Sequence, residues 1–108
     1  MIEIEAVLDA DGTLKACKAS GHSGVGKAGT DIVCAAVSVL MKTAFIVLSG
    51  RNGITVRGGA PEPGQMWLET EYNADGKAFL SAAGVFLIEG LKSVAQEFPQ
   101  NCNINIKT

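Results

Sequence analysis

The chain has 108 residues, a length that fits one domain with a hydrophobic core of its own. Its net charge is -2 and its pI is about 5.3, so it lacks the basic field that attracts nucleic acid or an anionic membrane. Hydrophobic residues make up 47%, with a mean hydropathy of +0.25. Because a small domain has much surface, this apolar excess favours a partner copy. We expect one domain over residues 1–108 that forms a homodimer.

The chain begins Met-Ile-Glu-Ile-Glu, without the basic and apolar regions of a secretory signal. The longest apolar run, residues 32–41, is too short to span a bilayer, so we expect no membrane partner. One histidine and three scattered cysteines offer neither the paired spacing of a metal site nor a disulfide framework. A reduced, cytoplasmic protein without metal or cofactor is the simplest expectation.

The chain opens with a predicted β-hairpin. Apolar and acidic residues alternate over residues 2–8, which is the period of a half-buried strand. A turn at residues 9–12 then leads into a second strand over residues 13–19. The next segment contains four glycines, which predict a pliable loop; they are Gly21, Gly24, Gly26 and Gly29.

A long helix is predicted over residues 31–49. Thr30 is a suitable N-cap, and Asp31 would place a carboxylate in the first turn, where the helix dipole favours it. The segment is apolar on nearly every side, so we expect this helix to be largely buried. Gly50 and the Asn52-Gly53 pair end it.

Two short strands, residues 54–57 and 66–72, are predicted around a loop with Pro61 and Pro63. A second helix begins near residue 76 and stops at Pro99, and a last strand alternates over residues 102–106. The apolar face of this helix holds Leu80, Ala83, Leu87, Leu91, Val94 and Phe98. The order ββαββαβ predicts an α+β fold, with a mostly antiparallel sheet of about five strands and two helices on one face.

The possible chemistry is concentrated between residues 20 and 38. His22 is the sole histidine, and Cys34 would lie in or just after the first turn of the first helix. That position favours a thiolate, and an imidazole folded back by the glycine loop would serve as its base. Backbone N–H groups of the loop and of the helix start would form an oxyanion hole. These parts predict a thiol nucleophile.

Asp31 and Ser38 lie three residues before and four after Cys34, on the same helix face. Asp31 would orient His22 or simply favour the helix terminus. Ser38 would hydrogen-bond near the sulfur or to a backbone carbonyl. Both are supporting candidates.

Each candidate has a plainer interpretation. A cysteine among Ile, Val and Ala is usually a small core residue, and spacing alone favours that interpretation for Cys34. His22 and the glycines would then be loop residues without a ligand, because the glycines match no nucleotide-binding motif. Cys17 and Cys102 are predicted to be structural. Trp67 and Tyr72 are predicted to be sheet-face or interface aromatics, and Arg51 and Arg57 stay open between surface charge and substrate contact.

The combination of Gly21-His22, Gly24, Gly29 and the run Asp-Ile-Val-Cys-Ala-Ala-Val-Ser at residues 31–38 closely resembles the signature of the ribosomal-processing cysteine protease family, Prp. The similarity covers the whole chain, including its length and its order of elements. The resemblance implies a homodimeric endopeptidase with a Cys34/His22 dyad. It also implies the substrate, the N-terminal extension of a basic large-subunit ribosomal protein that is cut after phenylalanine during ribosome assembly.

Two other functions remain open from the sequence. One is a non-enzymatic, ribosome-associated module that grips a peptide with the glycine loop. The other is a thiol redox switch in which Cys34 pairs with Cys17 or Cys102.

Overall fold

The computed structural model describes residues 1–21, 28–62 and 64–108. Its elements follow the predicted order ββαββαβ, which confirms the predicted fold class. The bounds are β1 Ile2–Leu8, β2 Leu14–Ser20, α1 Ala28–Leu48, β3 Ile54–Gly59, β4 Gln65–Tyr72, α2 Lys77–Glu97 and β5 Cys102–Lys107.

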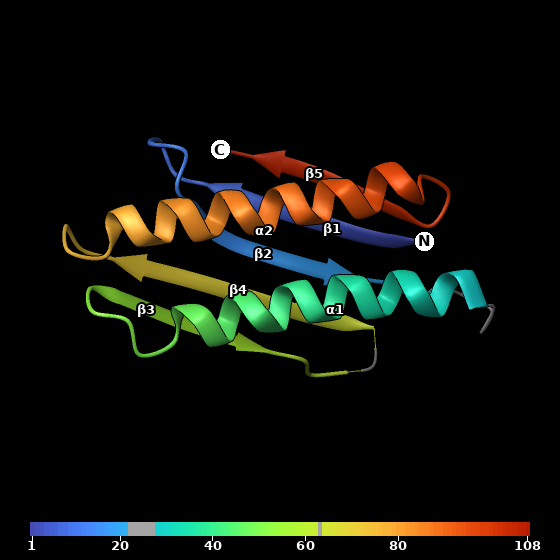
Figure 1. The fold of residues 1–108 in the computed structure, drawn as a ribbon, viewed down its shortest axis with the longest axis horizontal. Coiled ribbons are helices and arrows are strands. Elements are labelled where there is room, and N and C mark those ends of the chain that lie inside the picture. Colours follow the sequence, from blue (N-terminus) through green and yellow to red (C-terminus); the bar gives the residue numbers. More distant parts are fainter. Residues whose placement is uncertain (22–27, 63) are drawn as a thin grey trace.

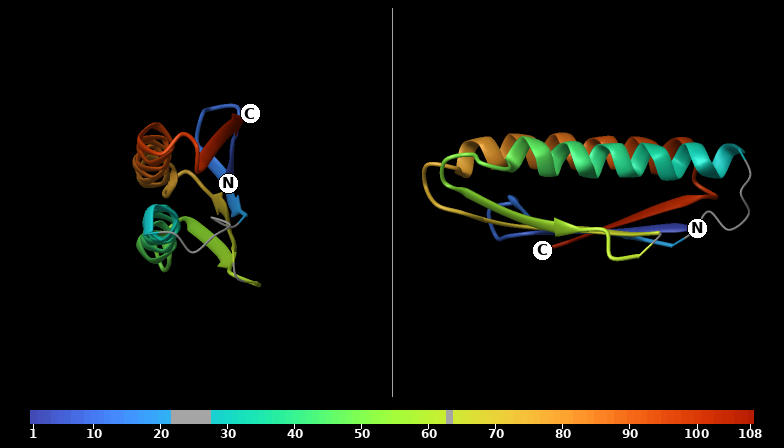
Figure 2. Two further views of the ribbon diagram at one scale, coloured as in Figure 1. Left: turned by 90° about the vertical axis from the view of Figure 1, so that its right-hand side faces the viewer. Right: turned by 90° about the horizontal axis from the view of Figure 1, so that it is seen from below.

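The strands form one sheet in the order β3-β4-β2-β1-β5 (Figure 1). Three neighbouring pairs are antiparallel, and β1 pairs with β5 in parallel, so the sheet is mixed and mostly antiparallel. Both helices lie side by side on one face of the sheet, which leaves the other face without a covering layer in the part of the chain described (Figure 2). That open face carries charged side chains, among them the ion pairs of Arg57 with Glu69 and of Lys107 with Glu5.

The core lies between the sheet and the two helices. It contains Ile2, Ile4 and Ala6 from β1, together with Val33, Val37 and Met41 from α1 and Leu87 and Leu91 from α2. The predicted apolar face of α2 is confirmed, because Leu80, Leu87 and Leu91 are buried. Helix α2 is long and apolar enough to cross a membrane by length and composition, yet it packs this face on the sheet.

The prediction that the first helix is largely buried is wrong. Ile32, Val39 and Ile46 repeat every seven residues along α1 and are all exposed, and Ile46 is 70% exposed. A two-layer arrangement buries only the side of a helix that faces the sheet, so a helix that is apolar all round leaves half of its apolar surface outside.

The first helix also begins earlier than predicted. It spans Ala28–Leu48, so Thr30 is a helical residue and not its N-cap. Gly29, predicted to belong to the loop, likewise lies in the helix. The helix start was predicted too late because Thr30 followed by Asp31 is a typical N-cap sequence. The residues just before Ala28 include no such capping side chain in the sequence.

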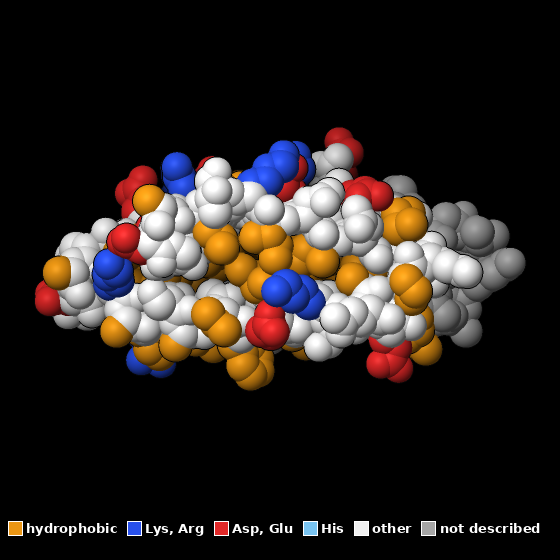
Figure 3. All heavy atoms as spheres, turned by 90° about the horizontal axis from the view of Figure 1, so that it is seen from above, with side chains coloured by type: hydrophobic (Ala, Val, Ile, Leu, Met, Phe, Trp, Pro, Cys, Tyr) orange, Lys and Arg blue, Asp and Glu red, His pale blue; other side chains and the backbone are white. Residues whose placement is uncertain are grey.

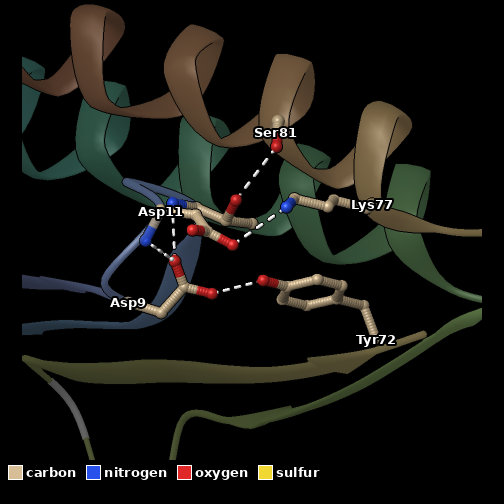
Figure 4. Close-up of polar contacts among 6 residues, drawn as sticks. Asp9, Asp11, Tyr72, Lys77 and Ser81 are labelled. Atoms are coloured by element: carbon tan, nitrogen blue, oxygen red, sulfur yellow. Dashed lines mark hydrogen bonds and ion pairs between the residues drawn. The ribbon is translucent and has the colours of Figure 1, made fainter. Parts of the chain in front are cut away.

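Polar contacts fasten the β1–β2 turn to the rest of the molecule (Figure 4). Oδ1 of Asp9 accepts hydrogen bonds from the backbone N–H groups of Asp11 and Thr13, and Tyr72 donates its hydroxyl proton to Oδ2 of Asp9. On the α2 side, Lys77 forms an ion pair with Asp11. These contacts hold the end of the sheet where β1 ends and β2 begins, and leave the opposite end for the site described next.

Candidate active site

A cavity of about 440 Å³ opens where β2 ends, β4 begins and the first half of α1 crosses the sheet. Its volume lies in the range of small-molecule and peptide side-chain sites. The described residues that line it are Ile2, Ala19, Ser20, Gly21, Cys34, Val37, Ser38, Ala60, Pro61, Glu62, Gly64, Gln65 and Met66. They come from four segments that are distant in the sequence.

Cys34 reaches this cavity from α1. The residues on either side of it along the inner helix face, Val33 and Val37, are buried against the sheet, whereas Cys34 is only half-buried. The thiol therefore sits at the border between core and cavity, and it is free. A side chain so placed is held by the helix on one side and open to a ligand on the other.

Ser38 lines the same cavity, as its position four residues after Cys34 predicts. The structure therefore brings these two candidates together. Asp31 is placed in α1 by its backbone, and its side chain lies outside the described part of the structure.

The predicted glycine loop is anchored at Gly21. Its φ of +113° lies in the left-handed region, and a Cβ at this position would lie 2.3 Å from the carbonyl oxygen of Met1, so only glycine fits. The N–H of Gly21 donates to the carbonyl of Gly64, 3.0 Å away. Gly21 lines the cavity, and His22 directly follows it in the sequence. His22 itself, with Gly24 and Gly26, lies outside the described residues.

The earlier helix start changes the chemistry expected of Cys34. It is the seventh residue of α1 and therefore lies in the second turn, in agreement with the prediction that it lies in or just after the first. The influence of a helix dipole falls off within the first turn, and N–H groups beyond it are bonded within the helix. The N–H groups of α1 around Cys34 are therefore not free to act as oxyanion-hole donors, and the predicted donors of the helix start are limited to its first turn.

The other two cysteines have core positions, which confirms their structural assignment. Cys17 on β2 and Cys102 on β5 are both buried. Burial raises the pKa of the Cys17 thiol to about 12, and burial together with the nearby Glu3 and Cys34 raises the pKa of Cys102. Raised pKa values suppress the thiolate, so neither group is suited to act as a nucleophile.

Sequence reasoning missed the segment between β3 and β4, which forms one wall of the cavity. Glu62 of this segment, with Gln65 and Met66 at the start of β4, lies at the cavity because β2 and β4 pair antiparallel, with Ser20 opposite Gln65. The backbone N–H of Gln65 donates to the carbonyl of Glu62, which closes a turn at this point. The sequence does mark this segment, by the glycines and prolines at residues 58–64. Its place near Cys34, however, depends on the pairing of β2 with β4, which no local sequence pattern reveals.

A half-buried thiol shares the wall of this cavity with Gly21, the residue before the sole histidine of the sequence, and such a thiol is what the class of thiol hydrolases requires. The family model described as cysteine protease Prp matches residues 1–103. The chain therefore belongs to the cysteine protease Prp family and is a cysteine endopeptidase.

Solved structures agree on the fold. The essential ribosomal processing protease Prp from S. aureus, in complex with a substrate peptide, has a TM-score of 0.82 at 18% identity, covering 99% of this chain and 100% of that one. The protein SMU.848 from Streptococcus mutans also has a TM-score of 0.82, at 24% identity, covering 100% of this chain and 96% of that one. The S. aureus Prp with a covalently linked product peptide gives 0.81 at 19% identity, covering 99% of this chain and 100% of that one. No curated protein matches the chain.

Proposed function

We propose that this endopeptidase trims the N-terminal extension of a large-subunit ribosomal protein in the cytoplasm during ribosome assembly. The observation that carries the proposal is the thiol of Cys34 on the wall of a cavity large enough for peptide side chains. Membership of the Prp family supports the choice of a ribosomal protein as the substrate. The similar structures from S. aureus support it too, because they are described as a ribosomal processing protease in complex with peptides. A basic ribosomal protein would also be attracted electrostatically to this chain, whose net charge is -2.

Cys34 and His22 form the proposed catalytic pair. His22 takes the thiol proton, the sulfur attacks the scissile carbonyl carbon, and the imidazolium gives its proton to the leaving amine as the peptide C–N bond breaks. Water then attacks the thioester, with His22 as base, and releases the carboxylate product and the thiol. Backbone N–H groups of the loop that starts at Gly21 stabilise the oxyanion, because those of α1 near Cys34 are bonded within the helix.

Asp31 and Ser38 have supporting roles in this proposal. Ser38 shares the cavity with Cys34 and offers a hydroxyl near the reacting atoms. Asp31 lies one helical turn before Cys34, on the side of the loop, where a carboxylate favours a charged imidazole.

The active molecule is proposed to be a homodimer. Six of the eight large hydrophobic side chains found exposed in the described structure lie on the two helices: Ile32, Val39, Ile46, Val47, Val85 and Phe86. Both helices cover the same face of the sheet (Figure 2), and hydrophobic side chains reach the surface on that side of the molecule, the lower part of Figure 3. An apolar surface of this kind is typical of a protein contact.

A peptide assay tests the catalytic pair. Wild type is expected to cleave a peptide that spans the extension, whereas Cys34→Ala, Cys34→Ser and His22→Ala are expected to be inactive with unchanged melting temperatures. Serine fails because a lone imidazole activates a hydroxyl poorly. Cys102→Ala is the control, since it removes a thiol that does not line the cavity. Full activity of His22→Ala would show that another group is the base.

A further inference from the structure

A second cavity, of about 260 Å³, lies beside the first, under the second half of α1. Ala60 and Met66 line both cavities, so the two adjoin each other. The other residues around the second cavity are Met41, Lys42, Phe45, Ile46, Gly58, Gly59, Trp67 and Leu68. None of them belongs to the proposed catalytic group.

The cavity exists because β3 ends in two glycines. A Cβ at Gly58 would lie 2.9 Å from Cδ2 of Phe45, so the missing side chain lets the Phe45 ring lie directly against the strand. Met41 and Met66 complete the walls with flexible thioether side chains, which adapt to a guest. The result is a hollow between α1 and the end of β3.

The lining selects an apolar occupant. Lys42 is the one charged residue among the described lining residues, and its exposed side chain places the charge at the mouth. A cavity of about 150 Å³ lined by aliphatic and aromatic residues is known to accept benzene, so this one has room for a large aliphatic or aromatic side chain. A cationic or acidic side chain would lose its hydration there without gaining a partner.

The neighbouring strand can guide an extended chain into this hollow. In the described sheet β3 is an edge strand, so one side of its backbone is open to pairing with a peptide. Along α1, Met41 and Phe45 lie seven and eleven residues after Cys34, or about 10 and 16 Å at about 1.5 Å per residue. An extended peptide covers that distance in about three to five residues.

We propose that the second cavity is a specificity subsite that takes a large apolar side chain of the substrate, about three to five residues from the scissile bond. This inference rests on the proposed function, because it places the same peptide in both cavities. It adds a requirement on substrate sequence that the nucleophile alone does not impose: an apolar residue remote from the bond that is cut.

Host peptides with one fixed phenylalanine at the cut position test the subsite. A second phenylalanine is moved through an otherwise Ala, Ser and Gln sequence, from one to seven residues away on either side. Dissociation constants are measured by calorimetry with the inactive Cys34→Ala protein, and kcat/KM is measured with wild type. We expect affinity roughly 10-fold higher at a spacing of three to five residues on one side than at other spacings.

Phe45→Ala is expected to abolish this preference while leaving the weaker peptides unaffected, which separates a subsite from a general structural defect. Phe79→Ala is the matched control, since Phe79 is also half-buried and lines neither cavity. Where Phe45→Ala does not fold, Phe45→Leu with Phe79→Leu is measured instead, and a partial loss of the preference is expected.

Affinity that is independent of spacing, or a preference that survives Phe45→Ala, would overturn the subsite. So would a Phe45→Ala protein with an altered oligomer mass and unaltered peptide binding, because the cavity would then belong to a contact between copies. A spacing preference in binding combined with no cleavage by wild type would refute the proposed hydrolysis and leave the subsite standing.

Discussion

The three cysteine side chains have two kinds of surroundings in this molecule. Cys17 and Cys102 alternate with outward-facing residues on strands, so their burial could be predicted from the period of two. Cys34 lies on a helix that is apolar all round, and no periodicity decides which side of such a helix meets a cavity. Cys34 was predicted to be the nucleophile from the presence of His22 in the same segment and from the family signature, whereas its cavity could be seen only in the structure.

Selective alkylation reports this difference. We expect a slight excess of iodoacetamide at pH 7.5 to modify one cysteine of the folded protein, identified as Cys34 by peptide mapping. Cys17 and Cys102 should react only in denaturant, because they are buried and their pKa values are raised. Equal labelling of all three thiols in the folded state would contradict the assignment.

The Tyr72–Asp9 hydrogen bond makes stability depend on pH. It lowers the pKa of Asp9 below the ordinary value, so its contribution is present above the unfolded pKa near 4 and is lost as pH falls through the lower folded value. Tyr72→Phe is therefore expected to lower Tm by a few degrees at pH 7 and by less near pH 2. Melting curves at both pH values, with Phe79→Leu as a control, check this. An equal loss of Tm at pH 7 and pH 2 would show that the ionisation of Asp9 does not contribute to stability through this hydrogen bond.

Among the elements, all five strands and both helices could be predicted, because the strands and α2 have a period, α1 is a long apolar run, and the turns carry glycine or proline. The start of α1 was misplaced by three residues. Thr30 and Asp31 resemble a cap, but a cap depends on backbone geometry that composition does not specify. Glycines in the loop were likewise indistinguishable from Gly29 in the helix.

Two glycines of α2 give different expectations for the same substitution. A Cβ at Gly84 would lie 2.8 Å from Cβ of Leu14, so Gly84→Ala should destabilise by about 1–3 kcal/mol through overpacking. At Gly90 the nearest atom is the mobile Cδ2 of Leu40 at 3.0 Å, so the gain in helix propensity, up to about 1 kcal/mol, should offset the contact. Urea unfolding of both variants measures the difference. A Gly84→Ala variant as stable as Gly90→Ala would refute close packing at this position.

At the scale of the molecule, the unusual feature is apolar surface. The composition predicted exposed apolar surface, but its location on α1 was not predicted. A helix that is apolar on every side was interpreted as buried, whereas α1 exposes half of that surface. The cavity walls show the same limit. The segment between β3 and β4 reaches Cys34 through the pairing of β2 with β4, and a pairing between segments so distant in the sequence leaves no local trace.

The exposed helix surface predicts the state of association. Light scattering at micromolar concentration is expected to give about twice the chain mass of 11.2 kDa. Val39→Glu combined with Phe86→Glu should give the single-chain mass, because two charges would have to be buried in an apolar contact. Glu3→Gln is a control on the open sheet face. A wild-type mass of 11.2 kDa would contradict the dimer.

Incubation with the extended ribosomal protein of the same organism tests whether the Cys34 cavity processes that protein, with intact masses measured over time. We predict one N-terminal truncation after a phenylalanine with wild type and Cys102→Ala, and no mass change with Cys34→Ala. An unprocessed ribosomal protein with active wild-type enzyme, or equal truncation by Cys34→Ala, would refute the proposed processing.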